Sequence, residues 1–230
     1  MPVSEIPVAV MVEHCSSVLA DKLAGKTNSG IVVGCGTGDE VVYLRRAFQS
    51  RQVFGVDVGT RFSELARAER CILMANALSL PFQHEAFDFA AAFHSLEHVG
   101  DAHQALAEIA RVLRPGGWFY VGVPNRTRVL GYLGSFDATM WQKITWNLTD
   151  WQARLRGKFH NEAGAHAGFD RNELTHLLEE RFGEVQVLTE EFLRFKYAKR
   201  VPAPVLNLLL LPSVINYSAP AHYALCRKSV

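Results

Sequence analysis

The residues with the clearest chemical potential form a short glycine-rich run between two apolar segments. Gly34-Cys35-Gly36-Thr37-Gly38 follows the apolar run 30–33 and precedes 39–48, where apolar residues recur at helical spacing. Glycine lets the backbone approach a ligand closely, and the first turn of the following helix presents free amide groups to a carboxylate or phosphate. A tight turn that serves packing alone is the alternative. We interpret the run as a ligand-binding loop whose contacts come from Gly34, Cys35, Gly36 and Gly38.

The spacing of these glycines distinguishes two classes of nucleotide-binding loop. The dinucleotide fingerprint GxGxxG needs its third glycine at position 39, where this chain has Asp39. The GxGxG spacing found here disfavours NAD and favours S-adenosylmethionine (SAM). Asp57 ends the next apolar run, about 20 residues beyond the loop, where a carboxylate can accept hydrogen bonds from both ribose hydroxyl groups of an adenosine. A helix N-cap is the alternative role for Asp57.

These residues must be positioned by the elements around them, and short apolar runs alternate with amphipathic segments along the chain. The runs are typical of strands buried on both faces of a parallel sheet and lie at 30–33, 52–56, 71–75, 87–93 and 118–123. Helices are expected at 8–23, 39–48, 62–68, 102–113 and 170–181, and two further strands at 184–191 and 217–227. The sequence predicts a Rossmann-like α/β fold: a seven-stranded, mostly parallel sheet with helices on both faces and an antiparallel last strand.

Composition narrows the class of protein. The 230 residues suit a single domain spanning 1–230, and the net charge of +1 gives no reason to expect a nucleic-acid partner. The four cysteines form no CxxC pair, which argues against a zinc ribbon and suits a reducing cytosol. The sequence contains neither a signal peptide nor an uninterrupted apolar span, so we expect a cytoplasmic protein.

Residues 30–125 resemble the core of class I SAM-dependent methyltransferases. The resemblance rests on four segments in the family's order and spacing: NALSLPF (76–82), FD (87–88), LEHV (96–99) and RVLRPGG (111–117). They are similar to the branch of small-molecule methyltransferases that includes quinone-biosynthesis enzymes. The resemblance implies that SAM is the cofactor and that a methyl group passes to a small, hydrophobic or lipid-like acceptor. A SAM-fold protein that binds without catalysis, in a regulatory role, is the alternative.

The resemblance also implies roles for individual residues. The glycine loop would hold the methionine part of SAM and Asp57 the ribose, while Val58 would lie against the adenine face. Asn76, with the backbone of Ala77, would bind the adenine edge. Asn76 stands where the family commonly has aspartate, but its amide oxygen can still accept a hydrogen bond. Val32 stands where the family commonly has an acidic residue, so the methionine amino group would need an anchor from elsewhere.

Methyl transfer depends on alignment of a nucleophile and exclusion of water more than on a dedicated catalytic group. The resemblance places Phe93 and His94 just past the fourth strand, where the sulfonium and the acceptor meet. His98 is the first candidate general base and His94 the second, because an imidazole with a pKa near 6.5 can take a hydroxyl proton at neutral pH. A structural role is the alternative for His98. No metal site is expected, since the spacing of Glu97, His98 and Asp101 is not diagnostic.

Two segments, about 126–167 and 192–216, fit the alternation poorly and are interpreted as insertions that build the acceptor side. The first contains Trp141, Trp146 and Trp151 and predicts no regular element. Within 194–215, basic residues precede an apolar, proline-broken run. This segment would either cover a hydrophobic acceptor or make peripheral contact with a membrane. A buried core contact or a homodimer interface is the alternative.

Overall fold

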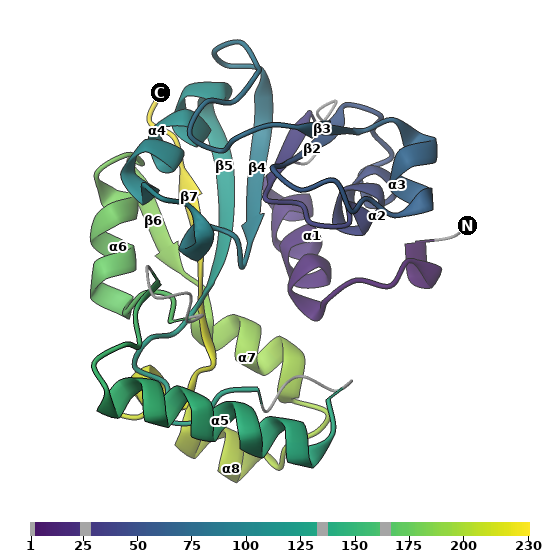
Figure 1. Ribbon diagram of the computed structural model, residues 1–230. Coiled ribbons are helices and arrows are strands. Elements are labelled where there is room, and N and C mark those ends of the chain that lie inside the picture. Colours follow the sequence, from purple (N-terminus) through teal and green to yellow (C-terminus); the bar gives the residue numbers. More distant parts are fainter. Residues whose placement is uncertain (1–2, 24–28, 133–137, 162–166) are drawn as a thin grey trace.

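The computed structural model describes residues 3–23, 29–132, 138–161 and 167–230. Within them the chain forms a seven-stranded sheet flanked by helices, with a group of helices beyond one end of the strands (Figure 1). The strands are β1 Gly30–Val33, β2 Val53–Asp57, β3 Ile72–Met74, β4 Phe87–Phe93, β5 Leu113–Pro124, β6 Glu184–Val187 and β7 Ala221–Arg227. The α-helices are α1 Val10–Lys22, α2 Asp39–Ala47, α3 Glu64–Glu69, α4 Ala102–Val112, α5 Met140–Leu155, α6 Arg171–Glu179, α7 Thr189–Tyr197, α8 Ala203–Leu209 and α9 Ile215–Ser218, and the 3-10 helices are η1 Val3–Glu5 and η2 Leu96–His98.

The sheet confirms the predicted fold class. Its strand order is β3-β2-β1-β4-β5-β7-β6. The strands from β3 to β5 pair in parallel, whereas β7 runs antiparallel to both β5 and β6. Successive strands are added toward one edge of the sheet from β1 to β3 and toward the other edge from β4 onward, so the strand order reverses between β1 and β4. In open α/β sheets, ligands bind at this switch point, outside the carboxyl ends of the strands.

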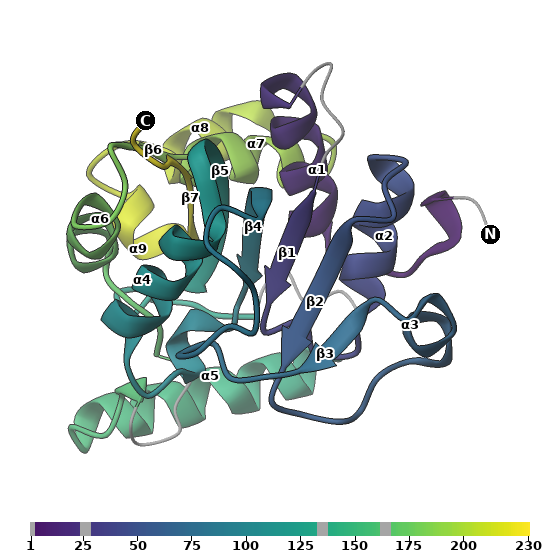
Figure 2. The same cartoon turned by 90° about the horizontal axis from the view of Figure 1, so that it is seen from above.

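Helices cover both faces of the sheet because each central strand is apolar on both of its sides. In β1, Val32 belongs to one core, whereas Ile31 and Val33 belong to the other. Figure 2 shows α1 and α2 on one face and α4 and α6 on the other. Successive side chains of one buried strand point to opposite faces of the sheet, so the same strand packs against both helical layers.

The central strands agree closely with the sequence prediction, and the later elements differ at their ends. The runs 30–33 and 87–93 are β1 and β4 with unchanged bounds. Strand β5 begins at Leu113 rather than at Trp118, because residues 114–117 form a bulge within the strand. Leu113 pairs with Phe87, and Trp118 pairs with Phe89. Strand β6 ends at Val187, four residues before the predicted end, because α7 begins at Thr189.

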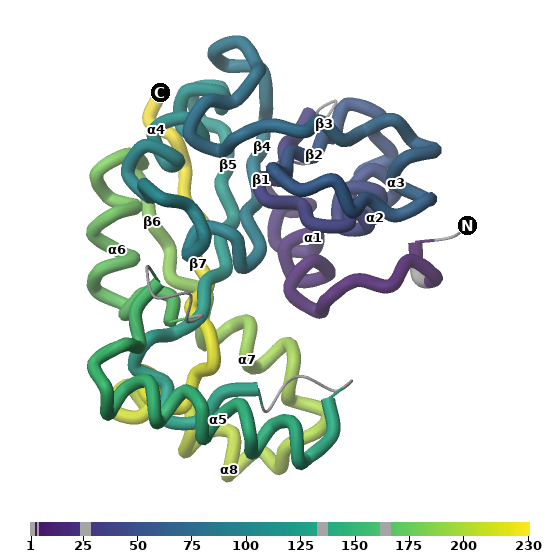
Figure 3. Tube along the Cα trace, viewed as in Figure 1, coloured from purple at the N-terminus to yellow at the C-terminus, as the bar shows by residue number. Residues whose placement is uncertain are grey.

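Both predicted insertions contain helices beyond the carboxyl ends of the parallel strands, as the tube trace in Figure 3 makes clear. The tryptophan segment forms the 16-residue helix α5, which begins at a capping box between Thr139 and Gln142. The second insertion holds the end of α7 together with α8 and the start of α9. None of the helices in the described parts of the chain combines the length and the apolar character that a bilayer crossing needs.

Candidate functional site

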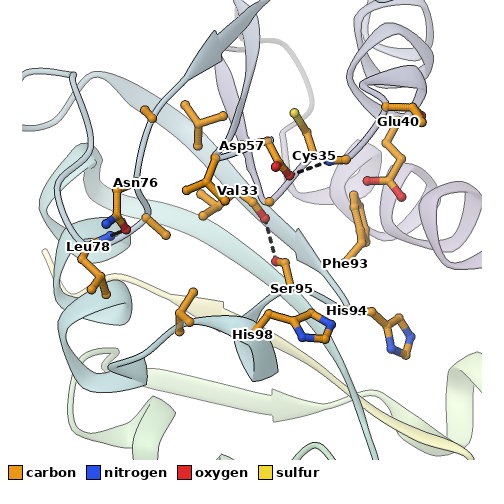
Figure 4. A pocket seen from close by; sticks show the side chains of 18 of the residues that line it. Val33, Cys35, Glu40, Asp57, Asn76, Leu78, Phe93, His94, Ser95 and His98 are labelled. Atoms are coloured by element: carbon orange, nitrogen blue, oxygen red, sulfur yellow. Dashed lines mark hydrogen bonds between the residues drawn. The ribbon is translucent and has the colours of Figure 1, made fainter. Parts of the chain in front are cut away.

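The largest cavity among those described, about 620 Å³, lies at the switch point of the sheet (Figure 4). Its walls come from the segments that follow the carboxyl ends of β1, β2, β3 and β4. The structure brings together every residue proposed from the sequence except Gly38, since the lining includes Gly34, Cys35, Gly36, Asp57, Val58, Asn76, Ala77, Phe93, His94 and His98. Parallel strands converge at this edge, which explains why residues distant in sequence meet here.

The glycines of the loop have different tasks. A Cβ atom built on Gly34 would lie 2.2 Å from the Cβ of Ser95, and one on Gly38 would lie 1.9 Å from Cδ1 of Ile72. Those two glycines therefore permit close packing behind the loop. A Cβ on Gly36 would meet nothing within 4 Å among the described residues, and its φ of +51° is in the left-handed region. Gly36 is thus the loop residue that leaves its backbone open to a ligand.

Asp57 links the glycine loop to the end of β2. Its Oδ2 accepts a hydrogen bond of 2.8 Å from the amide of Gly36, and its Oδ1 accepts one of 2.7 Å from the amide of Gly59. Each carboxylate oxygen has a further lone pair, so the side chain can also accept from ligand hydroxyl groups. Asp57 consequently combines the proposed ribose contact with a structural one.

Another part of the cavity wall is formed by the chain after β2 and after β3. Val58 is 72% exposed and Asn76 is also exposed at the cavity wall. The Asn76 amide oxygen accepts a 2.9 Å hydrogen bond from the backbone of Leu78, which fixes the orientation of the amide group. This leaves an apolar surface and an ordered polar edge, the two features that an adenine ring needs for stacking and hydrogen bonding.

Glu40, in the first turn of α2, is a cavity residue that the sequence analysis missed. Its side chain reaches from the helix toward the cavity, on the same side as Phe93 and His94 (Figure 4). Burial, reinforced by the nearby Asp39, raises the pKa of Glu40 to about 8. Val32, by contrast, is fully buried in the apolar core and lines no part of this cavity. The signal available in the sequence was an acidic residue two positions after the last glycine of the loop.

A second cavity, of about 380 Å³, adjoins the first and shares His94 and His98 with it. Its remaining walls come from the chain after β5, from α7 and from β7. The charged side chains among them are Glu97, Arg128 and Lys196, and the aromatic ones Tyr132 and Tyr223. Two histidines therefore lie on the boundary between the first cavity and the second.

Glu97 lies between the two histidines. Its Oε1 is 3.8 Å from Nδ1 of His94 and 3.9 Å from Nε2 of His98. The carboxyl group is buried, and neither oxygen has a hydrogen-bond partner among the described residues. Burial raises the pKa of Glu97 to about 7, against the opposing effects of a backbone hydrogen bond and of Arg128. This group can take up or release a proton near neutral pH, and its charge acts directly on both imidazoles.

His94 has an unusual backbone conformation at the end of β4. Its φ is +50°, and its amide donates a 2.8 Å hydrogen bond to the carbonyl of Gly122 on β5. A non-glycine residue in the left-handed region is held there by its surroundings, and such residues are frequent at ligand sites. The turn aims the imidazole at the junction of the two cavities.

The other candidate sites in the sequence are not part of this arrangement. Among the described residues, no group of three His, Cys, Asp or Glu side chains is placed to bind a metal ion. The part of the first insertion at 133–137 and 162–166 lies outside the described residues.

Known proteins resemble this chain in the same regions that build the cavity. The family model described as a methyltransferase domain matches residues 31–121. An O-methyltransferase of Aspergillus nomiae is 35% identical over 125 residues, which cover 50% of this chain and 55% of the relative. The chain is thus similar to methyltransferases over the region that builds the cavity. A demethylmenaquinone methyltransferase of Oceanobacillus iheyensis is 27% identical over 175 residues, covering 66% of this chain and 72% of the relative.

Solved structures show the same methyltransferase fold. The geranyl diphosphate C-methyltransferase of Streptomyces coelicolor A3(2), in complex with Mg²⁺, geranyl diphosphate and S-adenosylhomocysteine, has a TM-score of 0.54 and 18% identity, with 95% of this chain and 80% of that chain covered. The chain spans about half or less of the length of the first three curated relatives it matches. The similarity therefore covers the methyltransferase domain, and the acceptor must be inferred from the cavities.

Proposed function

We propose that this protein transfers a methyl group from SAM to a small, hydrophobic acceptor. The observation that carries the proposal is the pair of adjoining cavities, one lined by the glycine loop and Asp57 and the other by aromatic and charged side chains, with His94 and His98 on both. A methyl donor and an acceptor must meet at such a junction. The methyltransferase names of the relatives support the same reaction class.

The residues of the first cavity fit SAM. The open backbone at Gly36 suits the methionine part, Asp57 suits the ribose, and the wall of Val58, Asn76 and Ala77 suits adenine. Glu40 provides a carboxylate that the cationic amino group of the methionine part can pair with, which Val32 cannot provide. Bound SAM would supply a methyl group that is already activated on a positively charged sulfur.

The chain's own residues would align the acceptor, exclude water and accept its proton. His98 is the proposed general base and His94 the second candidate, because both imidazoles reach the junction of the cavities. The Glu97 carboxyl group lies 3.8–3.9 Å from both imidazoles. Glu97 is therefore proposed as a positioning residue that acts through the two histidines.

Calorimetry with S-adenosylhomocysteine tests the cofactor half of this proposal. We expect micromolar binding to the wild type, no binding of NADH, and loss of binding in Asp57→Ala, with Asp21→Ala as a matched control on an exposed face of α1. Thermal unfolding of both variants shows whether Asp57→Ala remains folded after losing the acceptors of the Gly36 and Gly59 amides. Binding of NADH instead, or no binding of either compound to the wild type, would contradict the proposal.

A panel of hydrophobic phenols and lipids tests the catalytic half. Formation of methylated product from SAM in the wild type supports methyl transfer. Tight S-adenosylhomocysteine binding without turnover across the panel would support a non-catalytic, regulatory protein instead.

The proposal extends to location and to partners. All four cysteines are buried free thiols, which supports a cytoplasmic location in a reducing compartment. Within 194–215 the side chains of Phe195, Leu208 and Leu211 are exposed near the cations Arg194 and Arg200, which supports peripheral membrane contact. Co-sedimentation with phosphatidylglycerol vesicles, and not with phosphatidylcholine vesicles, is expected. A homodimer in sedimentation velocity that leaves vesicles unbound would assign this face to a second copy instead.

A further inference from the structure

A third cavity extends the acceptor side away from the cofactor cavity. It has a volume of about 320 Å³ and lies among α7, α8 and the chain before β7. Its walls are mostly aliphatic, and Leu193, Leu206 and Leu210 in them are buried. None of the residues proposed to hold SAM or to accept the proton lines this cavity, so it can bind a separate part of a ligand.

The second and third cavities adjoin. Pro220 lines both of them. On α7, Lys196 lines the second cavity and the next residue, Tyr197, lines the third. The three cavities therefore form a series in which His94 and His98 separate the first from the second, and Pro220 marks the junction of the second with the third.

The chemistry changes along this series. The second cavity combines aromatic walls, at Tyr132 and Tyr223, with the cations Arg128 and Lys196. The third cavity is predominantly apolar, with Arg200 as its charged lining residue. A ring that carries an ionisable hydroxyl group suits the second cavity, because aromatic walls pack against a ring and cations stabilise the oxygen anion. A hydrocarbon chain suits the third.

We infer that the third cavity is a binding subsite for the hydrocarbon tail of an amphipathic acceptor whose hydroxylated ring occupies the second cavity. This assignment rests on the proposed methyl transfer for the orientation of the acceptor, and on the cavity series for its shape. The tail subsite anchors the acceptor so that its hydroxyl group reaches His94 and His98. Exposed Leu130 and Leu209 at the cavity wall give the tail a route in from solvent or from a lipid surface.

Binding of 4-octylphenol and of phenol to the wild type, measured by calorimetry with and without saturating S-adenosylhomocysteine, tests the subsite. We expect 4-octylphenol to bind at least tenfold more tightly than phenol, because burial of each methylene group is favourable. Equal affinities would overturn the proposal. If S-adenosylhomocysteine itself does not bind, the cofactor proposal fails, while the two phenols measured alone still decide the tail subsite.

A matched pair of variants locates the tail. Leu209→Trp fills the third cavity and is expected to bring the affinity for 4-octylphenol within threefold of that for phenol. Leu208→Trp, on the same helix but with its side chain 60% exposed and outside the cavity lining, is expected to keep the tenfold difference. Equal losses in both variants would show that octylphenol adheres to the exposed surface, which overturns the subsite.

A second pair on another wall guards against a folding defect in α8. Leu130→Trp is expected to repeat the loss, and Val129→Trp, which is exposed and outside the lining, is expected to spare it. Retained S-adenosylhomocysteine affinity in each variant shows that the cofactor cavity is intact. Retention of the tenfold difference in both filling variants would contradict the proposal.

Discussion

Glu40 places a carboxyl group in the cofactor cavity from the helix that follows the glycine loop. Position 32, where the family resemblance implies an acidic residue, holds a valine that is fully buried in the core. The carboxyl group in this cavity comes from α2 and not from β1. We propose that this group pairs with the amino group of the methionine part of SAM.

The pH dependence of cofactor binding checks the role of Glu40. Because its pKa is raised to about 8, the carboxyl is mostly protonated at pH 6, and a cationic ligand must drive its ionisation. Affinity for S-adenosylhomocysteine is therefore expected to rise between pH 6 and pH 7.5. In Glu40→Gln we expect affinity at pH 7.5 to fall about tenfold, equivalent to one pKa unit of differential interaction, and to lose this rise. Glu13→Gln, exposed on α1, is the control, and an unchanged pH profile in Glu40→Gln would refute the pairing.

Glu97 is expected to shape the pH profile of turnover. Its pKa is raised to about 7, so it ionises as the pH increases through neutrality and then places a negative charge beside His94 and His98. Glu97→Gln is expected to lower kcat by about tenfold to a hundredfold, within the range attributed to general base catalysis, and to remove the rising limb near pH 7. An intact rising limb in the variant would assign the titration to another group.

The same substitution has a defined effect on stability. A carboxyl group with a raised pKa contributes stability that is present below its unfolded value of 4.5 and is lost as the pH rises through about 7. Glu97→Gln carries no such penalty at high pH. Relative to the wild type, the variant should therefore gain up to about 3 kcal/mol of unfolding free energy between pH 4.5 and pH 8, measured by urea titration at each pH.

At the scale of elements, α5 is held to the rest of the protein by polar contacts. None of its 16 residues, all of them described, is buried. Asp150 accepts a 2.8 Å ion-pair contact from the buried Arg128, the Asn147 side chain bonds both backbone groups of Gly131, and the Trp151 indole donates to the carbonyl of Val129. These contacts attach the helix to one short segment, 128–132, beside the second and third cavities.

Removal of the Asp150 carboxylate is expected to release α5 locally. Asp150→Ala removes the carboxylate that contacts the guanidinium of Arg128, which is only 5% exposed, and loss of one member of a buried ion pair costs up to about 3 kcal/mol. Amide exchange and protease cleavage within Met140–Leu155 should increase. Thr149→Ala, the neighbouring residue whose hydroxyl bonds only within the helix, should leave both unchanged. Equal protection in the two variants would mean that the other contacts suffice.

Whether an element could be predicted from the sequence depends on the contacts that stabilise it. The strands β1 and β4 could be predicted to the residue because both are apolar runs buried on two faces. The helix α5 could not be predicted from periodicity, because Trp141, Trp146 and Trp151 are all exposed and mark no buried face. Its capping box at Thr139 and Gln142 was the available local signal.

The same distinction decides which residues of the candidate site could be predicted from the sequence. Residues that lie on the loop or at strand ends, such as Gly36 and Asp57, could be placed from spacing. Glu40 and Glu97 could not be assigned a site role, because their importance depends on burial and on neighbours from other elements. Lys196 reaches the second cavity only through the fold of the second insertion, for which the sequence predicted no helix.

For the whole molecule, buried histidines add an acid-sensitive contribution to stability. His14 joins α1 to β5 through a 2.9 Å contact between its Nδ1 and the Tyr120 hydroxyl group. Burial lowers the pKa of His14 to about 4, and that of His222 likewise. A group with a lowered pKa contributes stability above its unfolded value of 6.5, and this stability is lost as the pH falls toward 4.

The difference in unfolding free energy between His14→Gln and the wild type isolates this contribution, because other titrating groups cancel. The variant should improve relative to the wild type by roughly 2–3 kcal/mol as the pH falls from 6.5 to 4.5. Val8→Ala, partly buried beside the same core, is the control and should show a pH-independent difference. A constant difference for His14→Gln would mean that the folded protein accepts the proton freely.

The position of β7 governs the order in which the protein can be assembled during synthesis. β6 reaches the sheet only by pairing with β7, which separates it from β5. A ribosome that adds about 5–20 residues per second needs a few seconds to pass from β6 to β7, and during this interval β5 has an open edge. Strands with open edges pair readily with other chains. The nascent protein therefore depends on its 221–227 segment to close the sheet, and a pause in translation before that segment would prolong its exposure to aggregation and to chaperones.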